Sequence, residues 1–255
     1  MKKQMKSILI RKILIFIILV FLIIFCIIKV KGKTVETAKQ IEEPKISIKT
    51  ENHIKDVPYL NQKELGYPTG CEAVSATMLL QYKGYDVSVE DIVENTPNGS
   101  KKYESEDGTW YGANPFEEFV GHPKKRLSRG SYGVFAEPIV KSMSKFAEDR
   151  VKNISGCTIN ELFSYVSDGE PVVVWCVKNA GDLKEGVTWK YEDGSGSFQE
   201  LIGEHCAVLI GYDEKYVYLN DPSAGENVKQ DKEKFIYNWI KLYSQAIIVE
   251  AEEQD

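Results

Sequence analysis

The chain has 255 residues, a hydrophobic content of 43% and a formal net charge of −6, so it can bury one sizeable core or two small ones. The net negative charge, and the lack of a basic stripe interleaved with aromatic residues, argue against nucleic acid as a partner. Residues 32–34 read Gly-Lys-Thr but lack the first glycine and the preceding strand of a phosphate-binding loop. No nucleotide partner and no cofactor is therefore expected.

The N-terminus carries the strongest compositional signal. A basic head precedes an uninterrupted apolar run from Ile13 to Ile28. The run is a little short for a membrane span, but Lys12 and Lys29 can snorkel at its ends. Because no small-residue cleavage site follows closely, residues 1–30 are predicted to be an uncleaved signal-anchor, with a cleaved signal peptide and secretion as the alternative. The basic head should stay inside the cell, which leaves the remainder extracytoplasmic.

Residues 31–52 are polar, mixed in charge and without steady periodicity. They are predicted to be a stalk that holds a domain of residues 53–255 away from the membrane.

The central prediction is a helix that begins near Cys71. Thr69 and Glu72 have the spacing of a capping box, and Gly84 marks the end of the helix after Tyr82 or Lys83. Apolar residues surround the helix axis, which is typical of a buried helix. Cys71 falls in the first turn, where unpaired N–H groups and the helix dipole favour a reactive thiolate over a buried structural thiol.

Further elements follow from caps, apolar runs and turn residues. Expected helices begin near Ser88, Asn114, Pro138, Thr158 and Asp231. Expected strands are 172–177, 205–212, 216–221 and 246–249. Two stretches, 98–113 and 178–202, contain glycine and charged residues and are expected to be long irregular loops that act as lids. Helices come early and strands late, which indicates an α+β fold.

The hairpin formed by 205–212 and 216–221 brings two polar residues together. With a three-residue turn, Tyr212 pairs with Tyr216 and Ala207 lies opposite Asp221. His205 then points to the same face as Asp221, as a diagonal neighbour. A two-residue turn would put the two side chains on opposite faces, so this inference depends on register.

The five cysteines show no zinc-binding spacing. A disulfide between Cys157 and Cys176 stays open. Cysteine at a helix N-terminus, histidine opening a strand and a carboxylate on the adjacent strand are the three groups that nucleophilic catalysis by a thiol requires.

From Val57 onward, the chain resembles the C39-like cysteine peptidases, a papain-like superfamily. The resemblance rests on residues 57–62 (Val-Pro-Tyr-Leu-Asn-Gln), 67–75 (Tyr-Pro-Thr-Gly-Cys-Glu-Ala-Val-Ser), 205–212 (His-Cys-Ala-Val-Leu-Ile-Gly-Tyr) and 220–222 (Asn-Asp-Pro). The fold that it implies is a papain-like one, in which a central cysteine-bearing helix packs on an antiparallel sheet.

The resemblance implies Cys71 as nucleophile, His205 as general base and acid, Asp221 as the group that orients His205, and Gln62 as an oxyanion donor. It implies hydrolysis of peptide bonds in a peptide or protein substrate, which cell-wall peptide would also fit. Two other functions stay open: a thiol-dependent cell-wall amidase or transpeptidase on the same scaffold, and a binding module that has lost turnover.

Overall fold

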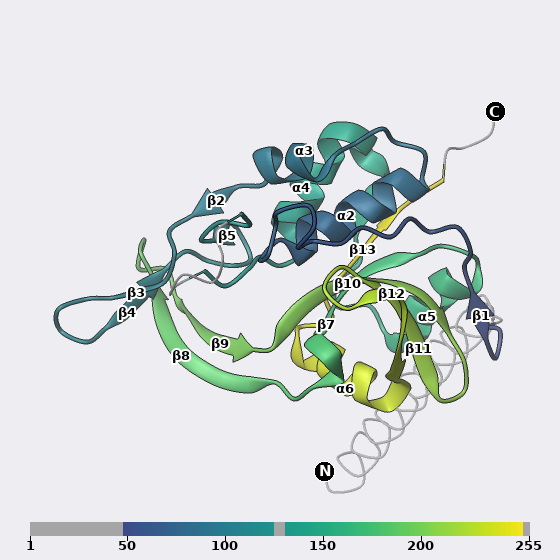
Figure 1. The fold of residues 1–255 in the computed structure, drawn as a ribbon. Helices are drawn as coiled ribbons and strands as arrows, with labels where there is room; N and C mark the ends of the chain where they lie inside the picture. The colour runs from purple at the N-terminus through teal and green to yellow at the C-terminus, as the bar shows by residue number, and fades with distance from the viewer. Residues whose placement is uncertain (1–47, 125–130, 252–255) are drawn as a thin grey trace, which may run out of the picture. The chain divides into compact units, whose positions relative to one another are not determined.

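An antiparallel sheet of seven strands forms the centre of the described part of the chain, which is residues 48–124 and 131–251 of a computed structural model (Figure 1). The strand order is β12-β11-β10-β7-β13-β6, with β1 paired to β10 off this path. The strands are β1 (Asn52–His53), β6 (Val151–Asn153), β7 (Val172–Val177), β10 (Glu204–Tyr212), β11 (Tyr216–Asp221), β12 (Gly225–Asp231) and β13 (Ala246–Val249). The strand predicted over 172–177 is confirmed, with β10 and β13 as its neighbours in the sheet. All its residues are buried, since helices α2 (Cys71–Tyr82) and α6 (Lys232–Lys241) pack against it.

Five α-helices surround this sheet in the described residues. They are α2 (Cys71–Tyr82), α3 (Val89–Asn95), α4 (Ala136–Ala147), α5 (Ile159–Ser167) and α6 (Lys232–Lys241), with 3₁₀ turns at Glu148–Arg150 and Lys178–Ala180. Helices α2, α3 and α4 pack on one another, and α2 lies against β10, β7 and β13. Every residue of α2 from Cys71 to Leu80 is buried, which confirms the predicted buried helix.

The helix caps agree with the sequence at two sites and differ at the third. Capping boxes begin α3 at Ser88 and α5 at Thr158. The capping box predicted from Thr69 and Glu72 was wrong, because the N-cap of α2 is Gly70 and has no side-chain capping bond. The Thr69 hydroxyl instead donates to the backbone oxygens of His122 and Pro123, and this frees the Glu72 side chain to enter the interior.

The two stretches predicted as irregular loops were interpreted wrongly. They supply a second sheet, with the order β3-β4-β8-β9, from strands β3 (Tyr103–Glu104), β4 (Trp110–Gly112), β8 (Lys184–Tyr191) and β9 (Ser197–Ile202). Its anchor is Trp189, which is fully buried, donates from Nε1 to the Ala113 oxygen at 2.9 Å, and packs on Tyr132 and Phe198. The irregular structure expected for these stretches is therefore wrong, whereas their role as lids stays a prediction.

The short helix predicted from Asn114 to Gly121 is also absent from the described chain. A turn begins there, with the Asn114 side-chain oxygen accepting from the Phe116 N–H. Strand β5 (Phe119–Val120) follows and pairs in parallel with β2 (Asn98–Gly99). Both residues of β5 are buried, so burial of the two side chains decides the local structure in favour of a strand.

The hairpin of β10 and β11 has a different turn from the one predicted. Tyr212 pairs with Val217 rather than Tyr216, so the turn is one residue longer. The ladder shifts between Leu209 and Gly211, and a β-bulge of this kind adds one residue to one strand. This shift cancels the extra residue of the turn. Beyond the bulge, Val208 lies opposite Asn220, which is the pairing that the predicted three-residue turn would give.

The predicted signal-anchor and nearly all of the predicted stalk fall outside the described residues. Within residues 48–124 and 131–251, no helix has the length and apolar character that crossing a membrane requires.

Replacing Trp189 tests whether the second sheet is anchored as described. Trp189→Ala should lower the free energy of unfolding by about 3–5 kcal/mol, because it leaves a large cavity and removes a buried hydrogen bond. Trp110→Ala, at a half-buried position in the same sheet, should cost clearly less. Urea denaturation of both variants makes the comparison, and equal losses would contradict the anchoring role.

Candidate active site

His205 and Asp221 meet where β10 begins and β11 ends. The imidazole Nε2 lies 2.7 Å from Asp221 Oδ1, and both side chains are buried. A hydrogen bond at Nε2 leaves Nδ1 of the ring for a second partner. The expected contact between the two side chains is thus present, across a ladder whose register the bulge restores.

The Asp221 carboxylate is held by the turn that follows it. Oδ1 accepts from the Ser223 N–H at 2.8 Å, the Ser223 hydroxyl at 3.0 Å and the Ala224 N–H at 3.1 Å. Burial acts to raise the pKa of Asp221, but the bonds from His205 and Ser223 outweigh it and hold this pKa below its usual value. The carboxylate therefore stays ionised beside the imidazole at neutral pH.

Cys71 is the first residue of α2, as predicted, and its side chain is buried. The backbone N–H of Cys206, next to His205 in β10, contributes a hydrogen bond to the thiol. The thiol itself donates to Glu72 Oε2 at 3.3 Å. No hydrogen bond joins it to the imidazole, although both residues lie in the described chain.

The expectation that the helix N-terminus favours a thiolate is not met in this arrangement. Burial raises the pKa of the Cys71 thiol well above its usual value, and the carboxyl groups of Glu72 and Glu204 add to this effect. The dipole of α2 is outweighed because the thiol is removed from water and faces acidic groups.

Gln62 lies between the segment that precedes Cys71 and the turn that follows Asp221. Its side chain is buried, and Nε2 donates to the Pro68 oxygen at 2.8 Å. Its backbone N–H donates to the Pro222 oxygen at 2.9 Å. An amide nitrogen carries two N–H groups, so one N–H of Gln62 remains for another acceptor.

Sequence reasoning missed three residues of the site. The first is Ser223, which contacts Asp221 and whose hydroxyl oxygen lies 3.3 Å from His205 Nε2. It could have been found from the sequence Asp221-Pro222-Ser223, because an aspartate in such a turn accepts a hydrogen bond from the N–H two residues later. Glu72 was assigned to a cap instead of the interior. Glu204 precedes His205, and its proximity to Glu72 depends on tertiary packing that no local pattern shows.

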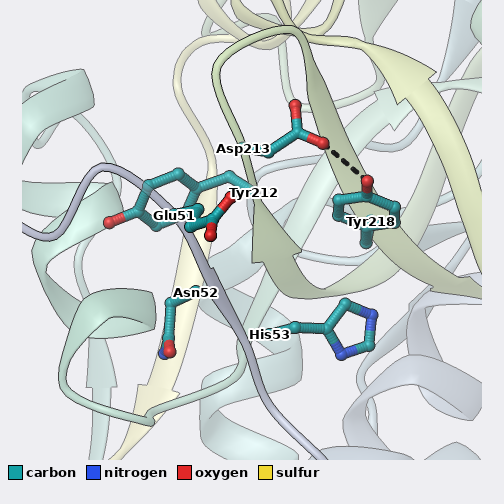
Figure 2. Close-up of a pocket in the computed structure, with 6 residues that line it drawn as sticks. All are labelled: Glu51, Asn52, His53, Tyr212, Asp213 and Tyr218. Carbon is teal, nitrogen blue, oxygen red and sulfur yellow. Dashed lines mark hydrogen bonds between the residues drawn. The ribbon is translucent and has the colours of Figure 1, made fainter.

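A surface pocket lies apart from these residues. It has a cavity volume of about 360 Å³ and contains none of the predicted site residues (Figure 2). Its lining is Glu51, Asn52, His53, Tyr212, Asp213 and Tyr218. The pocket lies where β1 pairs with the end of β10, so the strand separates it from His205.

The described cysteines, at positions 71, 157, 176 and 206, are all free, so the disulfide left open between Cys157 and Cys176 is not formed. Within residues 48–124 and 131–251, no group of three or more His, Cys, Asp or Glu side chains is placed to hold a metal ion.

Comparison with known proteins identifies the family. The profile of the Peptidase_C39 like family matches residues 54–247, which include every residue of the site described above. The chain belongs to this family.

Two relatives support the assignment. The uncharacterized protein YvpB of Bacillus subtilis (strain 168) is 31% identical over 182 residues, which cover 71% of this chain and 69% of YvpB. A crystal structure from Bacillus anthracis, of a protein provisionally assigned as a C39-like peptidase, matches with 31% identity and a TM-score of 0.71 over 81% of this chain and 100% of that one. The mixed helices and antiparallel sheet are thus the fold of C39-like peptidases.

The low pKa of Asp221 predicts how the stability of the domain depends on pH. A carboxyl whose pKa is depressed by folding stabilises the folded state above its unfolded pKa, near 3.9, and this contribution disappears as pH falls through the folded pKa. Asp221→Asn should therefore be less stable than the natural protein at pH 7, and the difference should shrink below about pH 4. Asp168→Asn, at an exposed position, is the control. Urea unfolding across pH measures both, and a gap that widens in acid would contradict the assignment.

Proposed function

We propose that this chain is a cysteine peptidase in which Cys71 attacks a peptide bond, His205 moves the proton and Asp221 orients and stabilises the imidazole. The observation that carries the proposal is the 2.7 Å bond between His205 Nε2 and Asp221 Oδ1. The next residue after His205 is Cys206, whose backbone contributes a hydrogen bond to the Cys71 thiol. The bond between His205 and Asp221 leaves Nδ1 of the imidazole to accept the thiol proton.

The reaction then proceeds in two halves. The thiol proton passes to His205, the sulfur forms a bond to the carbonyl carbon, and the carbonyl electrons move to oxygen. Collapse of this intermediate breaks the C–N bond, and His205 returns the proton to the leaving amine. Water then attacks the thioester, giving its proton to His205, and release of the acid restores the Cys71 thiol.

Gln62 is proposed to stabilise the oxyanion together with the Cys71 backbone N–H. The Nε2 bond to the Pro68 oxygen fixes the amide next to the segment that enters α2. The bond between the Gln62 backbone and Pro222 ties the same residue to the turn of Asp221. Such a position suits a preorganised donor, because it needs no rearrangement when charge develops on the substrate oxygen.

The proposed setting is a single-pass membrane protein with its catalytic domain outside the cytoplasm. Its support is the apolar run Ile13–Ile28 and the basic head before it. In that position the substrate would be a peptide or protein, which includes the peptides of the cell wall.

Identification of products decides the activity. The protein should be incubated with peptide and muropeptide libraries, and its products identified by mass spectrometry. Cys71→Ala should remove turnover, and Gln62→Ala should lower kcat about 10²–10³-fold. Gln81→Ala, in the last turn of α2, is the matched control and should retain activity.

The products also separate the competing functions. Hydrolysed peptide bonds support a peptidase, whereas cleavage of the bond between sugar and peptide or formation of new cross-links would assign an amidase or a transpeptidase. No product from either library, with Cys71 intact, would favour a binding module.

Membrane attachment has its own test. The natural protein should sediment with membranes and resist extraction by high salt or alkaline carbonate. Val20→Lys should weaken retention, since a lysine at the centre of a span costs about 2.5–3.5 kcal/mol. A mature N-terminus beyond residue 30 would overturn the anchor and indicate secretion.

A further inference from the structure

A buried acidic side chain, Glu72, and a half-buried one, Glu204, lie near the proposed nucleophile, and the peptidase mechanism does not use them. The Glu72 side chain is 1% exposed, and its Oε1 accepts from the Val134 N–H at 2.9 Å. A methyl group at Gly133 would stand 2.5 Å from Glu72 Oε1 and 3.1 Å from Glu204 Oε2. Both carboxyl groups therefore lie close to Gly133, in the space that a side chain would fill at that position.

The two carboxyl groups differ in what surrounds them. Burial raises the pKa of Glu72, but hydrogen bonds from its own N–H, from the Val134 N–H and from the Cys71 thiol oppose this by stabilising the anion. Glu204 Oε1 is buried with no hydrogen-bond partner in the described chain. Because two close carboxylates repel each other out of water, the pair favours one proton, and the unsupported Glu204 is the member that holds it.

We propose that Glu72 is a positioning residue that keeps Cys71 a neutral thiol in the free enzyme, with the S–H donated to the Glu72 carboxylate and the proton of the carboxyl pair held on Glu204. This inference rests on the proposed function, since it concerns the nucleophile of that reaction. When substrate enters, the S–H leaves Glu72 and its proton passes to Nδ1 of His205, while the sulfur keeps the electron pair. The free enzyme thus protects its cysteine from alkylating and oxidising agents.

The other titratable groups near the thiol are consistent with a neutral Cys71 and an ionised Glu72. The titratable groups that face Cys71, or the carboxyl pair, from neighbouring elements are His205, Cys206, Cys176 and Tyr132. Burial raises the pKa of Cys206, Cys176 and Tyr132 well above their usual values, so these three stay neutral. His205 attracts the Glu72 carboxylate when protonated, so the same carboxylate that opposes a thiolate stabilises the imidazolium that receives the proton.

Infrared spectroscopy of the natural protein tests the protonation state directly. The S–H stretch lies in a region free of other protein bands, and the full-length protein at pH 7 should show a component that Cys71→Ala removes. If Cys71→Ala removes no S–H intensity, the resting cysteine is a thiolate and the proposal is overturned. This measurement does not depend on any Glu72 variant folding.

The pH profile of alkylation tests the role of Glu72. Iodoacetamide labelling of Cys71, mapped by mass spectrometry, should shift by about one pH unit to lower pH in Glu72→Gln. The rate at pH 7 should then rise about tenfold, since the thiolate is the reacting form. Glu204→Gln is the matched control. Glu204 can raise the pKa of the Cys71 thiol only when it is ionised, so with the proton held on Glu204 an amide replaces a neutral carboxyl group and the profile should stay near that of the natural protein. An unchanged profile in Glu72→Gln, or an equal shift in Glu204→Gln, would overturn the assignment.

Neither measurement uses a substrate, so the outcomes separate the two proposals. An S–H band that depends on Cys71 together with an alkylation shift supports the role of Glu72 even if no peptide is cleaved. Peptide cleavage by a protein that lacks both signals would retain the peptidase and overturn the role of Glu72.

Discussion

Strand β10 is the constraint on which the site depends. It is hydrogen-bonded to β7 on one side and to β11 on the other, and α2 packs against it. His205 sits near its first residue, Asp221 ends the neighbouring strand, and Cys71 begins the helix. Three regular elements, rather than loops, thus place the three side chains, and such elements hold a constellation more rigidly than loops do.

Much of this arrangement follows from local signals. The first residues of α3 and α5 were predictable because Ser88 and Thr158 form capping boxes with residues of the same helices. Strand β7 was predictable because a short unbroken apolar run is typical of a strand that buries the side chains on both of its faces. The contact between His205 and Asp221 was predicted from a three-residue turn, and it is present because the bulge between Leu209 and Gly211 compensates the longer turn.

The features that were missed depend on contacts between distant segments. Strand β4 pairs in parallel with β8, which lies far along the chain. The alternation of Val187, Trp189 and Tyr191 with Thr188 and Lys190 does mark β8, and it was overlooked among the glycine and charged residues of that stretch. Glu72 shows the same limit at a single residue, because Thr69 and Glu72 have the spacing of a cap whether or not the carboxyl enters the core. Only the position of Val134 and Gly133, on another segment, decides between these two outcomes.

Because of the bulge between Leu209 and Gly211, the longer turn of this hairpin does not change the pairing near His205 and Asp221. One additional residue at the tip of the hairpin is absorbed before the ladder reaches Val208 and Asn220. An insertion at the tip and a matching irregularity in the strand therefore compensate each other. Relatives can in this way differ by one residue in hairpin length, and a gap in an alignment at this place need not mean that the histidine and the aspartate have moved apart.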